Sequence, residues 1–530
     1  MAGILLLLLV PLLVFLYIRT NDRKLSSLPA EVIATSPKRW TKEEVKQTEA
    51  ALVGAPPSLL SGQLLPKTGR RYIVVGGAGF LGGWIVVHLL ARGEDPRRIR
   101  VLDIRAPVRK DLTEGAAKDV DFLRVDMSDA QAVDAAFTKP WPTDSRASGE
   151  PEPELTVFHT AAIIRFYERH PDLLRFSDNI NVKGTQNILD AARRVGASTL
   201  VYTSSGSISV RRTRFWLWPW EMQPGYFVQA INDDDSLIPK QHDHFFSNYA
   251  VSKSRGEQLV RAAEKSPSGS GVLRTGCIRP GNGIYGPGGD ILIGLYLAQK
   301  KNMTWIANIM SSFVFVENCS LSHLCYEQRL IELQRGSAHP DIGGQAFCVA
   351  DAGPTTTYGE IYDALTLLTK GEVSFYHLSP TTMLALAHVV EAYYVGRHFL
   401  MQSPFAFLGR VIPPLTGDIV LLQPTLFALT NIHLLFDDSR ARAPPEKGGL
   451  GYNGGITTLQ GVCKVYLEHL NGGVLQRSIN AHSDVDHEFN PARAEKGVEE
   501  IVKKVEKSVE KGEKLLSNGI HRAANALNSK

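Results

Sequence analysis

The chain has 530 residues, a formal net charge of +4 at neutral pH, and 44% hydrophobic residues. This length accommodates one large α/β domain with additions, or two domains. A charge so close to balance argues neither for nucleic acid nor for a polyanionic substrate, and no nucleic-acid partner is expected. The five cysteines are widely spread and form no C-x-x-C pair, which favours reduced thiols in a cytosolic setting over disulfides or zinc. No metal-ligand cluster stands out in the sequence.

The chain begins with an apolar run at residues 4–18, which Arg19, Arg23 and Lys24 follow. The charges lie on the C-terminal side of the run, so the positive-inside rule places the rest of the chain in the cytosol. We expect residues 1–24 to form an N-terminal membrane anchor. A cleaved signal peptide and an interfacial helix that does not span remain alternatives. Residues 25–70 are predicted to form a linker with one short helix.

From residue 71 onward, short apolar runs alternate with helical patterns. The runs predict strands at 71–75, 98–103, 121–126, 155–159, 199–203 and 273–279. Helices are predicted between them, for example at 84–90, 130–137 and 187–195. Continuous apolar runs are typical of strands that are buried on both faces of a parallel sheet. Residues 71–280 therefore predict a Rossmann-type, doubly wound α/β domain.

Two insertions interrupt this domain, at residues 138–154 and 211–246. The second contains RFWLWPWEM, which either packs on its own domain or forms a lid or membrane-contacting loop near the site. Residues 281–475 are predicted to form a smaller substrate-binding region, in which the helix at 380–400 is either buried or monotopic in a membrane. Residues 476–530 predict a charged, amphipathic helical tail.

A glycine-rich turn, Gly76-x-x-Gly79-x-x-Gly82, follows the first predicted strand. Such a turn, which includes Phe80 and Leu81, lets backbone approach a pyrophosphate, while the N-terminus of the helix that follows faces the negative charge. This arrangement predicts a dinucleotide-binding site.

Acidic residues end the next two strands. Asp103 can accept hydrogen bonds from both ribose hydroxyls and repels a 2′-phosphate, which favours NAD over NADP, although Arg105 can accommodate a phosphate. Asp126, followed by Met127, ends the third strand, where a carboxylate can meet the adenine amino group or simply cap the strand. The small residues Thr160 and Ala161 after the fourth strand let backbone pass close to the cofactor.

Tyr249 and Lys253 are spaced i, i+4, so both side chains lie on one face of a predicted helix. A lysine ammonium and the nicotinamide cation favour the phenolate over the phenol. Tyr249 can then remove a hydroxyl proton as hydride leaves for NAD, while Lys253 holds the nicotinamide ribose. Ser205, after the fifth strand, can hydrogen-bond the substrate oxygen.

In this order the motifs resemble the extended short-chain dehydrogenase/reductases, and within them the 3β-hydroxysteroid dehydrogenase and sterol-4α-carboxylate 3-dehydrogenase group. The similar stretches are VFHTAA, NVKGTQN, YTSS, YAVSK, IRPGNGIYGPG and SFVFVENCSLSHL, within about residues 71–470. The resemblance implies that Tyr249 is the base, Lys253 its partner, Ser205 the substrate clamp and Asn181 a structural or relay residue. It also implies that Pro280, in IRPGNG, lies at the cofactor.

The resemblance implies an NAD(P)-dependent oxidoreductase that oxidises a 3β-hydroxyl on a sterol or steroid, with decarboxylation at C4 where a 4α-carboxylate is present. The implied partners are an apolar, sterol-like molecule, a membrane such as the endoplasmic reticulum, and a homodimer or sterol-pathway complex. Two alternatives stay open: an anchored reductase or epimerase acting on a secondary metabolite or nucleotide sugar, and a non-catalytic membrane scaffold. Between residues 379 and 430 only Arg397 and Arg410 are strong bases, which disfavours a nucleotide diphosphate.

Overall fold

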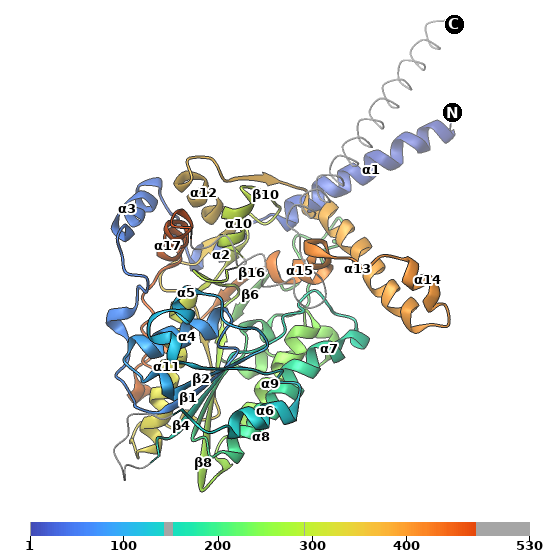
Figure 1. Ribbon diagram of the computed structural model, residues 1–530. Coiled ribbons are helices and arrows are strands. Elements are labelled where there is room, and N and C mark those ends of the chain that lie inside the picture. Colours follow the sequence, from blue (N-terminus) through green and yellow to red (C-terminus); the bar gives the residue numbers. More distant parts are fainter. Residues whose placement is uncertain (1, 143–151, 291, 473–530) are drawn as a thin grey trace, which may run out of the picture.

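A parallel sheet forms the centre of the computed structural model, which describes residues 2–142, 152–290 and 292–472 (Figure 1). Its strand order is β3-β2-β1-β4-β5-β8-β13, and β7 pairs antiparallel with β8. The bounds are β1 Arg71–Val75, β2 Ile99–Asp103, β3 Asp121–Arg124, β4 Leu155–His159, β5 Thr199–Thr203, β7 Ser266–Ser268, β8 Gly271–Pro280 and β13 Ala346–Val349. The predicted strands are confirmed to within two residues at each end, and with them the Rossmann-type fold.

Helices cover both faces of this sheet. α4 (Phe80–Ala91) packs with α11 (Val316–Gln334), whereas α6 (Ala130–Thr138), α8 (Thr185–Arg194) and α9 (Asn248–Ala262) lie on the opposite face (Figure 1). Alternate residues of β1 separate the two cores: Tyr72 and Val74 belong to the core with α4 and α11, and Ile73 and Val75 to the core with α6 and α8. Because both faces are covered, the strands are continuously apolar.

The first helix, α1 (Ala2–Leu25), packs on the rest of the molecule through its C-terminal part, where Asn21 and Leu25 are buried. Among the residues that the structure describes, no helix is long and apolar enough to cross a membrane. The predicted span over residues 1–24 is therefore unsupported.

Residues 26–70 form a packed part of the molecule. They contain α2 (Ala30–Thr35) and α3 (Lys42–Leu52), and α3 packs against α12 (Tyr358–Leu368) and α17 (Thr458–Leu470). Val32, Val45 and Leu60 are buried. Glu317 on α11 accepts hydrogen bonds from the Ser58 hydroxyl at 2.5 Å and from the Leu60 amide at 3.3 Å. A few well-placed apolar residues and one buried carboxylate thus hold a segment whose composition indicated a linker.

The C-terminal region adds small sheets and further helices. Its strands include β9 Ile284–Tyr285, β10 Lys301–Thr304, β11 Met310–Ser311, β12 Val314–Phe315, β14 Thr356–Thr357, β15 Ser374–His377 and β16 His433–Phe436. Its helices include α10 Ile293–Gln299, α13 Pro380–Gln402, α14 Ala406–Val411, α15 Pro424–Thr430 and α16 Ser439–Arg442. Two further short helices, α5 (Lys110–Thr113) and α7 (Leu174–Asp178), belong to the central domain. Strand β6 (Val228–Ile231), in the second insertion, pairs in parallel with β16. The insertion is therefore built into the C-terminal region.

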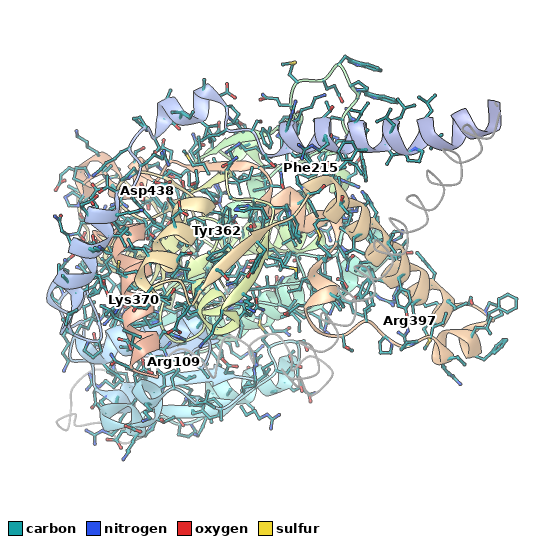
Figure 2. The ribbon with its side chains drawn as sticks, turned by 90° about the horizontal axis from the view of Figure 1, so that it is seen from above. Arg109, Phe215, Tyr362, Lys370, Arg397 and Asp438 are labelled. Carbon is teal, nitrogen blue, oxygen red and sulfur yellow. The ribbon has the colours of Figure 1, made fainter. Side chains whose placement is uncertain are left out.

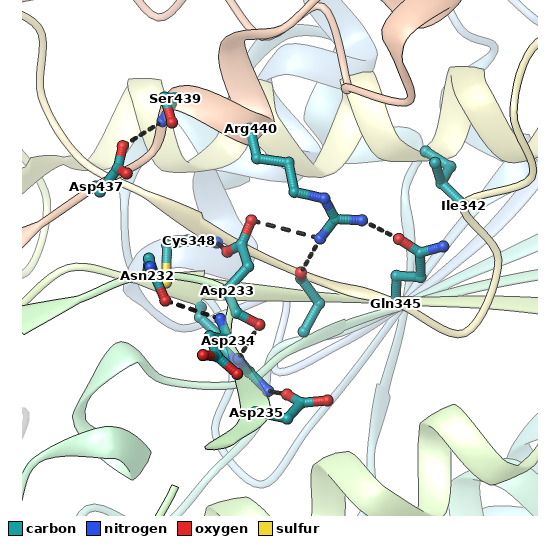
Figure 3. Close-up of polar contacts among 12 residues, drawn as sticks. Asn232, Asp233, Asp234, Asp235, Ile342, Gln345, Cys348, Asp437, Ser439 and Arg440 are labelled. Atoms are coloured by element: carbon teal, nitrogen blue, oxygen red, sulfur yellow. Dashed lines mark hydrogen bonds and ion pairs between the residues drawn. The ribbon is translucent and has the colours of Figure 1, made fainter. Parts of the chain in front are cut away.

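Polar contacts hold the returning end of this insertion against the sheet edge (Figure 3). Asp233 accepts a hydrogen bond from the Cys348 amide on β13, and its other carboxylate oxygen lies 3.5 Å from Arg440 of α16. Arg440 also donates to Gln345 and to the carbonyl of Ala346. The predicted charged tail and residues 143–151 of the first insertion lie outside the described residues.

A buried arginine joins β8, α9 and the insertion. Arg279 Nε donates to Glu257 Oε2 at 2.9 Å, and Arg279 Nη2 donates to Asp235 Oδ1 at 2.6 Å. Arg279 and Glu257 are 0% and 1% exposed, so neither charge has water as an alternative partner. The two charges therefore stabilise each other, and Arg261 completes the network through Asp235 and Glu257.

We expect Arg279→Leu to lower the free energy of unfolding by about 3–5 kcal/mol, because it leaves the buried Glu257 with only Arg261, at 3.3 Å, as a cation. Denaturant unfolding followed by circular dichroism measures this change. Arg97→Leu, which breaks an exposed pair with Asp95, is the matched control and should cost at most about 1 kcal/mol. Adding Glu257→Leu to the first variant should recover stability. A loss no larger than that of the control would contradict this account.

Candidate active site

The turn between β1 and α4 leaves no room for a side chain. Gly76 has φ +82°, and a Cβ on it would lie 2.7 Å from the Ala161 amide nitrogen. A Cβ on Gly82 would lie 2.2 Å from the Gly76 carbonyl oxygen. Gly79 immediately precedes α4, whose first turn contains Phe80. The backbone is thus bare beside a helix N-terminus, which fits a pyrophosphate.

Asp103 stands beside this turn at the end of β2. Its Oδ2 accepts from the Ala78 amide at 3.1 Å, and its Oδ1 accepts from the Arg105 amide at 3.2 Å. Burial raises the pKa of Asp103, and these backbone hydrogen bonds oppose the rise. The carboxylate therefore lies where a ribose bound at the glycine turn would need it.

Asp126 and Met127, which follow β3, differ in their exposure to solvent. Asp126 is exposed, and its Oδ1 accepts from the Ser128 amide at 2.9 Å and hydroxyl at 2.8 Å. Met127 is buried, and a Cβ on Gly184 would lie 2.6 Å from its methyl carbon. Met127 thus packs the adjoining helical turn, and contact of Asp126 with an adenine stays a prediction.

The ends of β4 and β8 also approach other backbone closely. The Thr160 and Ala161 amides donate to the Val75 carbonyl at 2.9 and 3.1 Å. A Cβ on Gly206 would lie 2.8 Å from the Pro280 carbonyl. Small residues at these positions keep the carboxyl edge of the sheet open, where ligands bind in such folds.

Ser205 and Tyr249 meet at this edge, although the whole second insertion separates them in sequence. Ser247 precedes α9, and its hydroxyl accepts from the Ala250 amide at 3.3 Å, so Tyr249 lies in the first turn of the helix. The Ser205 side chain lies close enough to the Tyr249 phenol to affect its pKa. Burial raises the pKa of Tyr249 to about 12, and the proximity of the Ser205 hydroxyl opposes this rise.

Lys253 lies one turn further along α9. Its Nζ donates to Tyr202 Oη and to the Thr203 carbonyl, both at 2.6 Å, and lies 4.1 Å from the centre of the Tyr202 ring. Burial lowers the pKa of Lys253 to about 7. No role was predicted for Tyr202 from the sequence. Its position in YTSS, at the end of β5, was the sequence feature that could have indicated a place in the site.

Asn181 lies in a π-helical turn, Asn179–Gly184. Its Oδ1 accepts from the Ile163 amide at 2.9 Å, and its Nδ2 donates to the Ile163 carbonyl at 3.0 Å and to Ser252 Oγ at 2.9 Å. These contacts fix the segment after β4 relative to α9. A relay role stays a prediction.

The segment Gly286–Asp290 begins within the IRPGNGIYGPG stretch and is dense in glycine, but no role was predicted for it from the sequence. Trp84 Nε1 on α4 donates to the Pro287 carbonyl at 2.8 Å, and a Cβ on Gly289 would lie 3.1 Å from Phe80 Cβ. Asp290 is buried, accepts from the Gly294 amide at 3.1 Å, and has a pKa that burial raises to about 7. This segment therefore lies against the start of α4, the helix that follows the glycine turn.

Comparison with known proteins gives a consistent family. Residues 73–370 match the model of the 3-beta hydroxysteroid dehydrogenase/isomerase family. A 3beta-hydroxysteroid-dehydrogenase/decarboxylase (isoform 2) of Arabidopsis thaliana is 26% identical over 426 residues, which are 77% of this chain and 64% of that protein. The mouse 3 beta-hydroxysteroid dehydrogenase type 7 is 26% identical over 378 residues, 70% of this chain and 89% of that protein. The chain thus spans less than two thirds of the Arabidopsis relative.

Solved structures with a similar fold include a UDP-glucose 4-epimerase of Thermotoga maritima, with 15% identity and a TM-score of 0.48 over 76% of this chain and 99% of that one. An epimerase of Methanothermobacter thermautotrophicus has 16% identity and a TM-score of 0.49 over 77% of this chain and 94% of that one. These values carry no conclusion about activity or ligands.

Gly76→Ala is expected to abolish NAD binding, because the new Cβ meets backbone and the residue must keep a left-handed conformation. Titration calorimetry with NAD measures the loss. Gly62→Ala is the control, since nothing lies within 4 Å of its Cβ position. Unchanged NAD affinity in the Gly76 variant would rule out this turn as the pyrophosphate site.

Proposed function

The chain belongs to the 3-beta hydroxysteroid dehydrogenase/isomerase family, and on that premise we propose that it oxidises the 3β-hydroxyl of a sterol with NAD, and decarboxylates the product where the sterol carries a 4α-carboxylate. The family match confirms the predicted class of enzyme, an NAD-dependent oxidoreductase of the 3β-hydroxysteroid dehydrogenase type. One observation carries the proposal. The Ser205 and Tyr249 side chains lie close together, one helical turn before Lys253, at the carboxyl edge of the sheet that also holds the glycine turn.

Proton removal falls to Tyr249. Bound NAD supplies the hydride acceptor, and its oxidised ring brings a positive charge that favours the phenolate. Ser205 hydrogen-bonds the substrate oxygen as the Tyr249 oxygen takes the hydroxyl proton, while the hydride leaves C3 and a ketone remains. Lys253, held by Tyr202 and Thr203, adds a second cation on the same helix face when it is protonated.

Decarboxylation needs no further group in this scheme. The 3-ketone of a 4α-carboxylated sterol is a β-keto acid: the bond between C4 and the carboxylate breaks, CO₂ leaves, and the electron pair passes to the ketone as an enolate. The enolate is then protonated at C4. Ser205 can hydrogen-bond the enolate oxygen, which is an oxyanion-type stabilisation. The Arabidopsis relative whose name includes decarboxylase supports this choice of substrate class.

We expect NADH to form from NAD and a 4α-carboxylated 3β-hydroxysterol, with equimolar CO₂, in detergent-solubilised protein. Tyr249→Phe should lower turnover by about 10²–10⁴-fold while NAD still binds, because only the proton acceptor is lost. Tyr376→Phe, at an exposed tyrosine, is the matched control.

If only sterols without the carboxylate are oxidised, the proposed dehydrogenase activity holds and the proposed decarboxylation is wrong. If no 3β-hydroxysterol is oxidised although NAD binds, the sterol assignment fails, and nucleotide sugars or other ketones become the substrates to test.

Sterol oxidation should accelerate with rising pH, since Tyr249 acts only when its phenol is deprotonated. Ser205→Ala removes the hydroxyl that lowers the pKa of Tyr249, so the rise should move to higher pH and the rate should fall about 10²-fold. Ser207→Ala removes the other side-chain partner of Ser205 and should shift the profile less. The measurement is kcat/KM between pH 6 and 10. A lower rate with an unmoved profile would contradict the link between these two residues.

A further inference from the structure

Tyr202, at the end of β5, contacts the Lys253 side chain in two ways. Its Oη accepts a hydrogen bond from Lys253 Nζ at 2.6 Å, and its ring centre lies 4.1 Å from the same nitrogen. A hydroxyl oxygen and the face of an aromatic ring both attract positive charge. Both residues are almost completely buried, so water does not compete for these contacts. Tyr202 therefore stabilises the ammonium form of Lys253 over the neutral amine.

The two acceptors on β5 determine how Lys253 uses its protons. Nζ donates to Tyr202 Oη and, also at 2.6 Å, to the Thr203 carbonyl. A neutral amine would use both of its protons in these bonds, whereas an ammonium keeps a third N–H for another partner. Only the ammonium can therefore donate to a bound ribose while both contacts with β5 are kept.

Thr185 and His159 form a buried polar cluster beside Tyr202. The Thr185 hydroxyl donates to the Asn181 carbonyl at 2.8 Å, so His159 Nε2, which lies 3.0 Å from Thr185 Oγ1, must be the donor of that contact. His159 Nδ1 has no hydrogen-bond partner among the described residues, which agrees with a proton on Nε2. Burial raises the pKa of Tyr202, and the nearby Thr185 hydroxyl opposes the rise. Thr185 Oγ1 is thus available as an acceptor for the Tyr202 hydroxyl, whose oxygen keeps its lone pairs for Lys253.

The other titratable groups around Lys253 do not compete for its proton. Burial and the nearby Lys253 lower the pKa of His159, at the end of β4, to about 3, so the imidazole is neutral. Burial raises the pKa of Cys277 on β8 well above its usual range, so the thiol is neutral as well. Glu257 on α9 accepts from the buried Arg279. Among the described residues that face Lys253, only tyrosine hydroxyls are left to exchange a proton with it.

Lys253 and Tyr249 can share one proton in two ways at the same net charge. Either the proton is on the lysine and Tyr249 is a phenolate, or both groups are neutral, and only the first arrangement can accept a proton from a substrate. A change in pH does not convert one into the other, because both hold the same number of protons. Burial favours the neutral pair, since it raises the pKa of Tyr249 to about 12 and lowers that of Lys253 to about 7. A group that stabilises the ammonium therefore increases the share of the phenolate.

We propose that Tyr202 is a positioning residue that keeps this shared proton on Lys253 and thereby leaves Tyr249 as the phenolate base. It acts through the hydrogen bond of its hydroxyl and the face of its ring, both directed at Lys253 Nζ. The use of the phenolate rests on the proposed function, whereas the effect of Tyr202 on the protonation of Lys253 does not.

NMR spectroscopy of the full-length protein, labelled with carbon-13 at the lysine Cε and free of NAD and substrate, measures the pKa of Lys253. Loss of the signal in Lys253→Arg assigns it. We expect the pKa of Lys253 to fall by about one unit in Tyr202→Phe, because the ring remains but the hydrogen-bond acceptor is lost. Thr185→Val, which removes the neighbour of the Tyr202 hydroxyl, should lower the pKa of Lys253 by less.

The matched control is Tyr362→Phe on α12, in the C-terminal region (Figure 2). Tyr362 is also buried, and its hydroxyl lies 3.0 Å from Thr304 Oγ1, so this variant loses a comparable contact that does not involve Lys253. It should leave the pKa of Lys253 unchanged, and thermal unfolding checks that each variant folds. The proposal is overturned if the pKa of Lys253 in Tyr202→Phe equals that of the wild type.

The pH dependence of kcat/KM for sterol oxidation separates proton placement from a structural role. Tyr202→Phe should react within about twofold of the wild type at pH 6, where Lys253 is still largely protonated, and about tenfold more slowly at pH 9, where the neutral pair is favoured. A loss by the same factor at every pH indicates a structural defect and overturns the effect on the base. If the wild type oxidises no sterol, the proposed function fails, whereas the pKa of Lys253 still decides the role of Tyr202.

Discussion

The close contact of α9 with the sheet determines where the proposed catalytic side chains, Tyr249 and Lys253, lie. A Cβ on Gly256 would lie 2.6 Å from the Asn181 carbonyl and 2.8 Å from Tyr202 Oη, so only glycine lets the helix approach this far. One residue later, Glu257 bonds to the buried Arg279 of β8. With the helix fixed at this point, Tyr249 and Lys253 are carried to the ends of β4 and β5. The geometry of the site thus depends on residues that never touch a substrate.

Burial disfavours the charged form of both central groups in the structure. The pKa of Tyr249 is raised to about 12 and that of Lys253 is lowered to about 7, which avoids the cost of unpaired charges in a poorly solvated place. A dinucleotide bound at the glycine turn would change this balance, because its cationic ring stabilises a phenolate. In the mechanism that we propose, cofactor binding thus activates Tyr249, and the hydroxyl of Ser205 lowers the pKa of Tyr249 in the same direction.

The sequence predicted the parts of the molecule that follow from local pattern. The strand positions, the glycine turn and the grouping of Ser205 with Tyr249 could all be inferred, because apolar runs and short motifs report the carboxyl edge of a parallel sheet. Packing between segments that are distant in the sequence could not be predicted. The buried place of Leu60 depends on Glu317, and the contact of Trp216 with both Tyr17 and His388 depends on three segments that are distant in sequence. The hydrophobic periodicity of a sequence does not indicate which distant segments contact each other.

The pairing of β6 with β16 has a consequence for biosynthesis. His433 on β16 lies opposite Val228, so the second insertion cannot complete its strand until about two hundred further residues have left the ribosome. The Leu25 carbonyl likewise has no bond to Asn431, whose side-chain amide donates to it at 3.0 Å, until that residue has been synthesised. The central sheet can therefore form while the insertion and the base of α1 still lack their partners. Until residues 431–436 emerge, Val228–Ile231 of the insertion and Leu25 at the base of α1 lack these hydrogen-bond partners.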